Sequence, residues 1–248
     1  AYAGVSGVMC VVAGVLVGRL RGELPPLDPS SSILGVLRAS FAVTSAQVLS
    51  SLMMSVPVWL LIYLERLSDV GRYSGASYLL TVVALLGSSL QTILLTRFRR
   101  SLEETGASSV FTRARSTSLS ALLVGAVLML PVVLLGDRVL VTVYGEGFAV
   151  GRVSLLLFAL SAVSIPIAYV WNSVLLVVNA FRAQALTSFV SIAATVGAGI
   201  FSVVLGAAPL VAATFSVFVG LAVRALLSYI EARKWLNREV ERRTAAAR

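Results

Sequence analysis

Apolar positions along this 248-residue chain gather into long stretches, separated by shorter segments that hold most of the charged residues. A helix that crosses a bilayer needs roughly 20 mostly apolar residues, because the hydrocarbon core is about 30 Å thick. The stretches that approach this length are Tyr2–Gly18, Ser40–Leu64, Ser74–Leu95, Thr117–Leu135, Val153–Val178, Ala183–Leu205 and Leu210–Ile230. The pattern therefore predicts about seven transmembrane helices.

The composition indicates the same class of protein. The chain is 58% hydrophobic and 12% charged, with a mean hydropathy of +0.95, whereas soluble domains are about 45–50% apolar and about 25% charged. A transmembrane β-barrel would show roughly 10-residue segments of alternating polarity, but long runs such as Ala121–Leu135 do not alternate. The expected fold class is therefore an all-α integral membrane protein.

The distribution of basic residues predicts the orientation in the membrane. If the loops alternate between the two sides, one side carries Arg66, Arg72, Arg138 and Arg152. The other side carries Arg19, Arg21, Arg38, Arg97, Arg99, Arg100, Arg113, Arg115, Arg182, Arg233, Lys234, Arg238, Arg242, Arg243 and Arg248. Because an excess of Lys and Arg marks the cytoplasmic side, the N-terminus is expected outside and the C-terminus inside. The net charge of +9 then needs no nucleic-acid partner to explain it.

The order of the segments divides the chain into four expected parts. Residues 1–18 form the first helix, and residues 19–38 a cytoplasmic linker that contains Pro25, Pro26 and Pro29. Proline fixes the backbone φ angle and removes a hydrogen-bond donor, so the linker is expected to be extended. Residues 39–230 hold the other six helices, and residues 231–248 a basic cytoplasmic tail that continues as a charged helix. Thr96–Ser116 is expected to be an inner loop that contains a surface helix.

The sequence offers few residues that are suited to enzyme catalysis. The chain has no histidine, which removes imidazole acid–base catalysis and imidazole metal ligands. The interiors of the predicted helices contain no Asp or Glu, so they offer no carboxylate pair. We therefore expect no enzymatic activity, no metal site and no cofactor.

Polar side chains within or near the predicted helices are the candidates for a hydrophilic path. Gln47, Gln91 and Asn172 either line such a path or form hydrogen bonds between helices. Arg224 lies within the last predicted helix. It either lines the path or extends to the phosphate headgroups at the membrane surface.

Two segments carry a resemblance to a known family. The first is Asp69-Val-Gly-Arg-Tyr-Ser-Gly-Ala-Ser-Tyr-Leu-Leu, which follows a helix ending in Tyr63-Leu-Glu-Arg. The second is Val139-Leu-Val-Thr-Val-Tyr-Gly-Glu-Gly-Phe, followed by an apolar helix and Asn172-Ser-Val-Leu-Leu-Val-Val-Asn-Ala. Together they resemble the polysaccharide (O-antigen type) flippases of the multidrug/oligosaccharidyl-lipid/polysaccharide exporter superfamily. The similarity extends from Ser40 to Ile230.

The resemblance implies one six-helix lobe of a two-lobe transporter, preceded by the last helix of the other lobe. The odd number of helices behind an external N-terminus and the lack of an initiator methionine favour the same expectation, with an N-terminal lobe missing from this chain. The family's proteins flip lipid-linked oligosaccharides of the polyprenyl-pyrophosphate type by alternating access, for the synthesis of cell-surface polysaccharide. The implied location is the plasma membrane, and the implied partners are the lipid-linked oligosaccharide, membrane lipid and the missing lobe.

Arginine suits a pyrophosphate substrate because its forked donors match the geometry of phosphate oxygens. The candidate residues for the substrate path are Arg97, Arg182, Arg224, Gln47, Gln91 and Asn172. The family often carries an acidic residue in the region that reads Ser55-Val-Pro-Val-Trp here, and this chain has none there. A drug or cation antiporter of the same superfamily, which needs an intramembrane carboxylate, and a non-transporting membrane assembly subunit are the alternatives.

Overall fold

A computed structural model describes residues 48–49 and 51–246. The chain divides into two compact units, Ala1–Phe41 and Ala42–Arg248, and all described residues belong to the second. This part of the chain is almost wholly α-helical and contains no strand among its described residues. The expected all-α class is therefore confirmed for the second unit.

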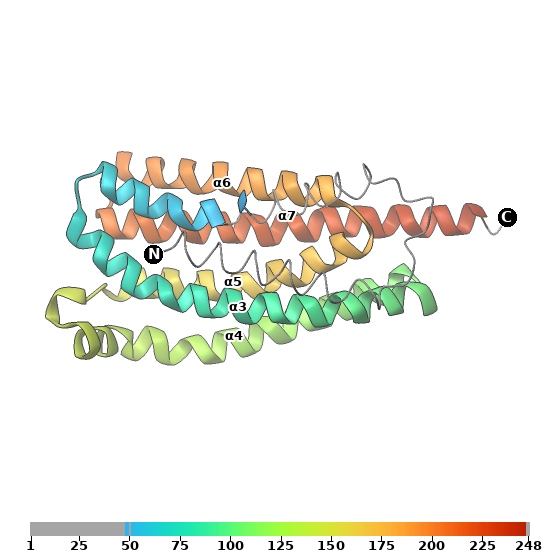
Figure 1. Ribbon diagram of the computed structural model, residues 1–248, viewed down its shortest axis with the longest axis horizontal. Coiled ribbons are helices and arrows are strands. Elements are labelled where there is room, and N and C mark those ends of the chain that lie inside the picture. The colour runs from blue at the N-terminus through green and yellow to red at the C-terminus, as the bar shows by residue number, and fades with distance from the viewer. Residues whose placement is uncertain (1–47, 50, 247–248) are drawn as a thin grey trace, which may run out of the picture. The chain divides into compact units, whose positions relative to one another are not determined.

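Five long helices and one shorter helix make up the described residues of this unit (Figure 1). The shorter helix is Ser51–Tyr63, and the long ones are α3 (Leu67–Glu104), α4 (Ala107–Tyr144), α5 (Arg152–Val177), α6 (Phe181–Val204) and α7 (Pro209–Ala246). A single 3₁₀ turn, η1 (Glu146–Phe148), lies between α4 and α5. Each of the five long helices is long and apolar enough to cross a membrane. The expected count of seven is not confirmed, since Tyr2–Gly18 lies outside the described residues and Ser40–Leu64 is represented mainly by the shorter helix Ser51–Tyr63.

The helices α3 and α4 are longer than the predicted membrane spans, so the long inner loop expected between them is not present. Thr96–Ser116 does not contain a separate surface helix, because α3 continues to Glu104 and α4 already begins at Ala107. Only Thr105 and Gly106 separate the two helices. Gly106 has a φ angle of +90°, a backbone conformation that residues with a Cβ atom rarely adopt. The charged end of α3 carries two ion pairs at a spacing of four residues, Arg99 with Glu103 and Arg100 with Glu104, which add a small stabilisation to the helix.

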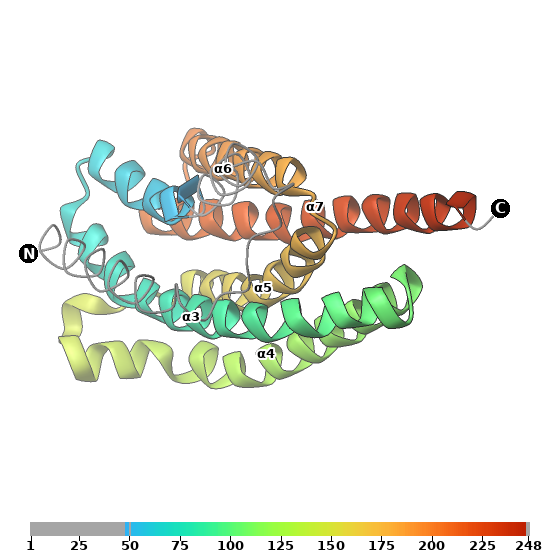
Figure 2. The ribbon, with the colours of Figure 1, turned by 45° about the vertical axis from the view of Figure 1, so that its right-hand side comes forward.

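The helix α5 lies at the centre of the unit, in contact with α3, α4 and α7, and α6 packs along α7 (Figure 1, Figure 2). More than half of the apolar span of α5 is buried, whereas none of the apolar span of α4 is. Leucine and valine side chains such as Leu123, Val127 and Leu134 are therefore exposed along α4. Apolar side chains on an outer face are expected where lipid, rather than water, surrounds a helix.

Two apolar clusters follow one another along the bundle. The first contains Met53, Leu61, Tyr73, Leu80, Phe158, Ile165, Val217 and Leu221 among its buried residues. The second contains Leu94, Phe98, Val110, Val170, Trp171, Leu175, Ala232 and Leu236. Along α7, the first cluster ends at Leu221 and the second begins at Ala232, so Arg224 and Ser228 lie between the two clusters. The interior of the bundle thus changes from apolar to polar between them.

The charged tail forms the end of α7, as the sequence predicted. The helix continues without interruption to Ala246, and Lys234 pairs with Glu231 at 2.7 Å on its exposed surface. The guanidinium of Arg238 lies 5.3 Å from the ring centroid of Trp235, within the range of a cation–π interaction.

The orientation predicted from the arginines can be tested at two exposed positions. In a Cys10→Ala background, we expect Ser68→Cys to react with a membrane-impermeant thiol reagent in intact cells, while Ser108→Cys reacts only after permeabilisation. Both serines are exposed, at the start of α3 and at the start of α4 respectively, and the basic side is expected to face the cytoplasm. Equal labelling of the two positions in intact cells, or labelling of Ser108→Cys alone, would contradict the orientation.

Candidate functional site

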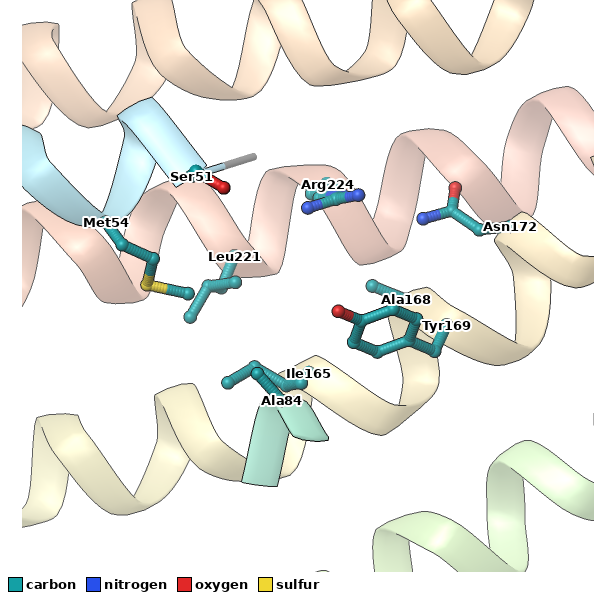
Figure 3. A pocket seen from close by; sticks show the side chains of 9 residues that line it. All are labelled: Ser51, Met54, Ala84, Ile165, Ala168, Tyr169, Asn172, Leu221 and Arg224. Carbon is teal, nitrogen blue, oxygen red and sulfur yellow. The ribbon is translucent and has the colours of Figure 1, made fainter. Parts of the chain in front are cut away.

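A cavity of about 120 Å³ lies between the first apolar cluster and Arg224 (Figure 3). Its walls come from the helix Ser51–Tyr63 and from α3, α5 and α7. The lining residues are Ser51, Met54, Ala84, Ile165, Ala168, Tyr169, Asn172, Leu221 and Arg224. The cavity therefore combines an apolar wall with a few polar side chains, which is the usual composition of a binding site for a small ligand.

Arg224 is the cationic side chain of this cavity. It is only 9% exposed, and its Nε atom has no hydrogen-bond partner among the described residues. Figure 3 shows the guanidinium on α7 facing the space that Ile165 and Tyr169 border from α5. A buried hydrogen-bond donor without a partner costs about 1–3 kcal/mol. Water or an anion in the cavity would satisfy the Nε–H group of Arg224.

The position of Arg224 bears on whether its side chain lines a path inside the bundle or extends to the headgroups, which the sequence left open. A side chain that reached the headgroups would be exposed near the end of its helix. Arg224 is instead buried, and α7 continues for several further turns beyond it. The burial of Arg224 therefore favours the interpretation as a side chain of the bundle interior over one that extends to the membrane surface.

Asn172 and Ser228 form a polar contact between α5 and α7 beside the cavity. The hydroxyl of Ser228 donates to Oδ1 of Asn172 at 3.0 Å, and both side chains are buried. Because Asn172 follows Tyr169 by three residues and Ser228 follows Arg224 by four, each pair shares one face of its helix. The hydrogen bond therefore holds the polar faces of α5 and α7 toward each other. Asn172 thus forms a contact between helices and also lines the cavity.

Tyr169 is held in the cavity wall by close packing of α5 on α3. A Cβ atom added to Gly87 would lie 2.8 Å from Cε2 of the Tyr169 ring, a distance that real contacts do not show. Glycine at this position therefore allows the aromatic ring to approach the backbone of α3. Together, the guanidinium of Arg224, the amide nitrogen of Asn172 and the hydroxyl of Tyr169 give the cavity wall three kinds of hydrogen-bond donor.

The other predicted path residues do not join this cavity. Arg97 on α3 and Arg182 at the start of α6 are exposed, and Gln91 is half-buried on α3 outside the cavity wall. Gln47 lies outside the described residues. The structure therefore brings together Arg224 and Asn172 from the predicted set. It adds Tyr169 and Ser51, which the sequence did not single out.

Acidic side chains are kept away from the cavity in the described part of the chain. No Asp or Glu there is buried, and no group of three His, Cys, Asp or Glu side chains comes together as a metal site. The lining of the cavity likewise contains no carboxylate. The charge that it presents is that of Arg224 alone among its described residues.

The two segments that carry the family resemblance lie against each other. Nε of Arg72 donates to the carbonyl oxygen of Gly147 at 2.6 Å. A Cβ atom on Gly75 would contact the ring of Phe148 at 3.6 Å, so this glycine makes room for the ring. The ring of Tyr144 lies 5.2 Å from that of Phe148. The turn after α4 is thereby fixed to the first turns of α3, a contact across 75 residues that no local sequence pattern indicates.

Asp137 fixes the other end of the same turn. Its Oδ1 atom accepts hydrogen bonds from the backbone N–H groups of Val150 at 2.8 Å and Gly151 at 3.0 Å. Gly151 precedes the first residue of α5 and has a φ angle of +84°. A carboxylate at the start of a helix satisfies free N–H groups and complements the helix dipole. Asp137 therefore has a structural role at this end of the bundle.

Comparison of the chain with protein families, with curated proteins and with solved structures finds no match.

Proposed function

We propose that this chain contributes one six-helix lobe to a transporter that flips lipid-linked oligosaccharides across the plasma membrane. The proposed substrate is an oligosaccharide on a polyprenyl-pyrophosphate carrier, moved by alternating access for the synthesis of cell-surface glycan. The observation that carries the proposal is the buried guanidinium of Arg224, with an unpartnered Nε, at a cavity inside a bundle of apolar helices. Intramembrane ionisable residues commonly mark substrate paths.

The donors of the cavity favour an anionic ligand. Arg224, Asn172 and Tyr169 can all donate hydrogen bonds, and an arginine guanidinium can bind two oxygens of one phosphate group. A cation antiporter would need an acceptor of opposite charge, and the described lining offers no carboxylate. The chemistry of the cavity therefore favours the flippase over the antiporter.

The size of the cavity favours the headgroup of the proposed substrate as its occupant over the sugars. A volume of about 120 Å³ holds several water molecules, since about 10–15 Å³ of such space is enough for one. A phosphate group fits such a space, whereas an oligosaccharide does not. In this proposal the sugars occupy the larger space between this lobe and its partner lobe, while the polyprenyl chain stays in the lipid.

Arg97 and Arg182 have a different part in the proposed path. Both are exposed near the predicted inner ends of their helices, where a pyrophosphate headgroup would first meet the protein. Lysine keeps the charge but loses the planar fork of donors. We expect Arg97→Lys and Arg182→Lys to slow flipping in the intact two-lobe protein without changing its expression. Unchanged flipping by both variants would limit these residues to a role in orientation.

Vesicles that contain the intact two-lobe protein provide the test of the proposed substrate class. We expect a fluorescent oligosaccharide on polyprenyl pyrophosphate to cross the membrane, and the same oligosaccharide on an uncharged lipid to remain on its original side. A fluorescent organic cation, driven by a proton gradient, should not be transported. Export of the cation without flipping of the pyrophosphate lipid would overturn the proposal in favour of the antiporter.

A further inference from the structure

A second, larger pocket lies at the end of the bundle where α3 and α5 leave their apolar segments. It has a volume of about 770 Å³, and α3 contributes Leu95, Thr96, Arg99 and Arg100 to its wall. The last residues of α5, Leu176 and Val177, border it from the other side. This pocket shares no lining residue with the cavity of Arg224.

The wall of this pocket divides into an apolar part and a cationic part. Leu95, Leu176 and Val177 lie at the ends of apolar segments, and Arg99 and Arg100 follow one helical turn beyond Leu95. A ligand that fits both parts has hydrocarbon at one end and an anionic group at the other. Basic pockets between transmembrane helices are suited to the headgroups of anionic lipids.

We infer that this pocket binds the phosphodiester headgroup of an anionic membrane phospholipid. Arg99 and Arg100 contact the phosphate oxygens, and the first methylene groups of the acyl chains lie against Leu95, Leu176 and Val177. The apolar residues distinguish such a lipid from free inorganic phosphate, which has no apolar surface to bury. The inference is independent of flipping and requires only that the end of α3 lies at the membrane surface.

The acidic neighbours of the two arginines do not prevent this binding. Nε of Arg99 lies 3.4 Å from Oε1 of Glu103, and Nε of Arg100 lies 2.7 Å from Oε1 of Glu104. Both arginine side chains are 79% exposed, and ion pairs at exposed positions are weak because water screens them. A lipid phosphate can therefore replace the glutamates at small cost. Because Glu103 also borders the pocket, its negative charge should weaken the binding of an anionic lipid.

The test measures lipid bound to the purified chain by native mass spectrometry, after exchange into micelles that contain phosphatidylglycerol or phosphatidylcholine. We expect the chain to retain phosphatidylglycerol in preference to phosphatidylcholine. Because Arg99 and Arg100 each lose their contacts to the phosphate oxygens, Arg99→Gln/Arg100→Gln should weaken the retention of phosphatidylglycerol at least about tenfold. Glu103→Gln should strengthen it.

Arg113→Gln/Arg115→Gln provides the matched control. These arginines are exposed in the first turns of α4, on the same side of the membrane, but do not border the pocket. The control variant loses the same charge and should retain phosphatidylglycerol nearly as well as the original chain. Equal loss in both double variants would show general attraction to the surface and overturn the inference. Equal retention of phosphatidylcholine and phosphatidylglycerol by the original chain would overturn it as well.

Discussion

If the protein has the proposed function, Arg224→Met should abolish most of the flipping activity of the two-lobe transporter while leaving its stability unchanged or higher. Hydrogen bonds to charged groups contribute about 1.5–3 kcal/mol, so the loss of phosphate contacts should slow flipping roughly 10- to 150-fold. Methionine has a similar length and needs no partner in the cavity. Replacing a buried, incompletely paired charge by an apolar side chain is often neutral or stabilising.

Measuring both the flipping rate and the melting temperature of Arg224→Met distinguishes a functional role of Arg224 from a purely structural one. If the side chain only stabilised the bundle, Arg224→Met would lower the melting temperature in detergent and flipping would fall with the amount of folded protein. Arg233→Met on the same helix is the matched control, because Arg233 is exposed and lies outside the cavity. Normal flipping by Arg224→Met, at normal expression, would contradict the assigned role.

Gly220→Ala should lower the stability of the bundle strongly for a substitution that adds only one methyl group. A Cβ atom on Gly220 would overlap with Oγ1 of Thr195 and lie 3.2 Å from the backbone oxygen of Ser191. Glycine and small hydroxyl residues allow α6 and α7 to approach closely in a membrane. Extra atoms in a well-packed interior cost typically about 1–3 kcal/mol. We expect a lower melting temperature in detergent and a smaller yield of folded protein.

Gly197→Ala is the matched control for this prediction. Gly197 lies on an exposed face of α6, and no described neighbour lies within 4 Å of an added Cβ atom. The same substitution should therefore be neutral there, or slightly stabilising because alanine favours the helix. Equal melting temperatures for the two variants would contradict the close packing of α6 on α7.

The helical class and the charged tail were predictable from local properties of the sequence. Long apolar stretches leave few alternatives to membrane helices, because backbone groups in lipid must be satisfied within the segment. The end of α3 and the start of α4 were not predictable in this way, because the hydropathy of the sequence falls at Arg97 although the helix continues. The spacing of Arg99 with Glu103 and of Arg100 with Glu104 was the signal that could have indicated this continuation.

The candidate site was predictable only in part, because a helix that is apolar on all sides does not reveal which face lies inward. The sequence identified Arg224 and Asn172 as polar residues near or within predicted helices, but could not show that both border one cavity. Tyr169 lies within an apolar stretch of the sequence and gives no sign there of which face it occupies, and its position in the cavity wall depends on Gly87 of a different helix. The contact of Arg72 with Gly147 likewise depends on how distant segments pack.

The proposed headgroup site can be tested most directly by protection of a cysteine in the cavity wall. Ser51 is exposed and borders the cavity, so Ser51→Cys in a Cys10→Ala background should react with a small water-soluble thiol reagent. In the intact protein, polyprenyl pyrophosphate should slow this reaction, and an uncharged polyprenol should not. The protection should disappear when Arg224 is also replaced by methionine. Protection that is equal with and without the Arg224 side chain, or equal for polyprenol and polyprenyl pyrophosphate, would contradict an anionic headgroup site at Arg224.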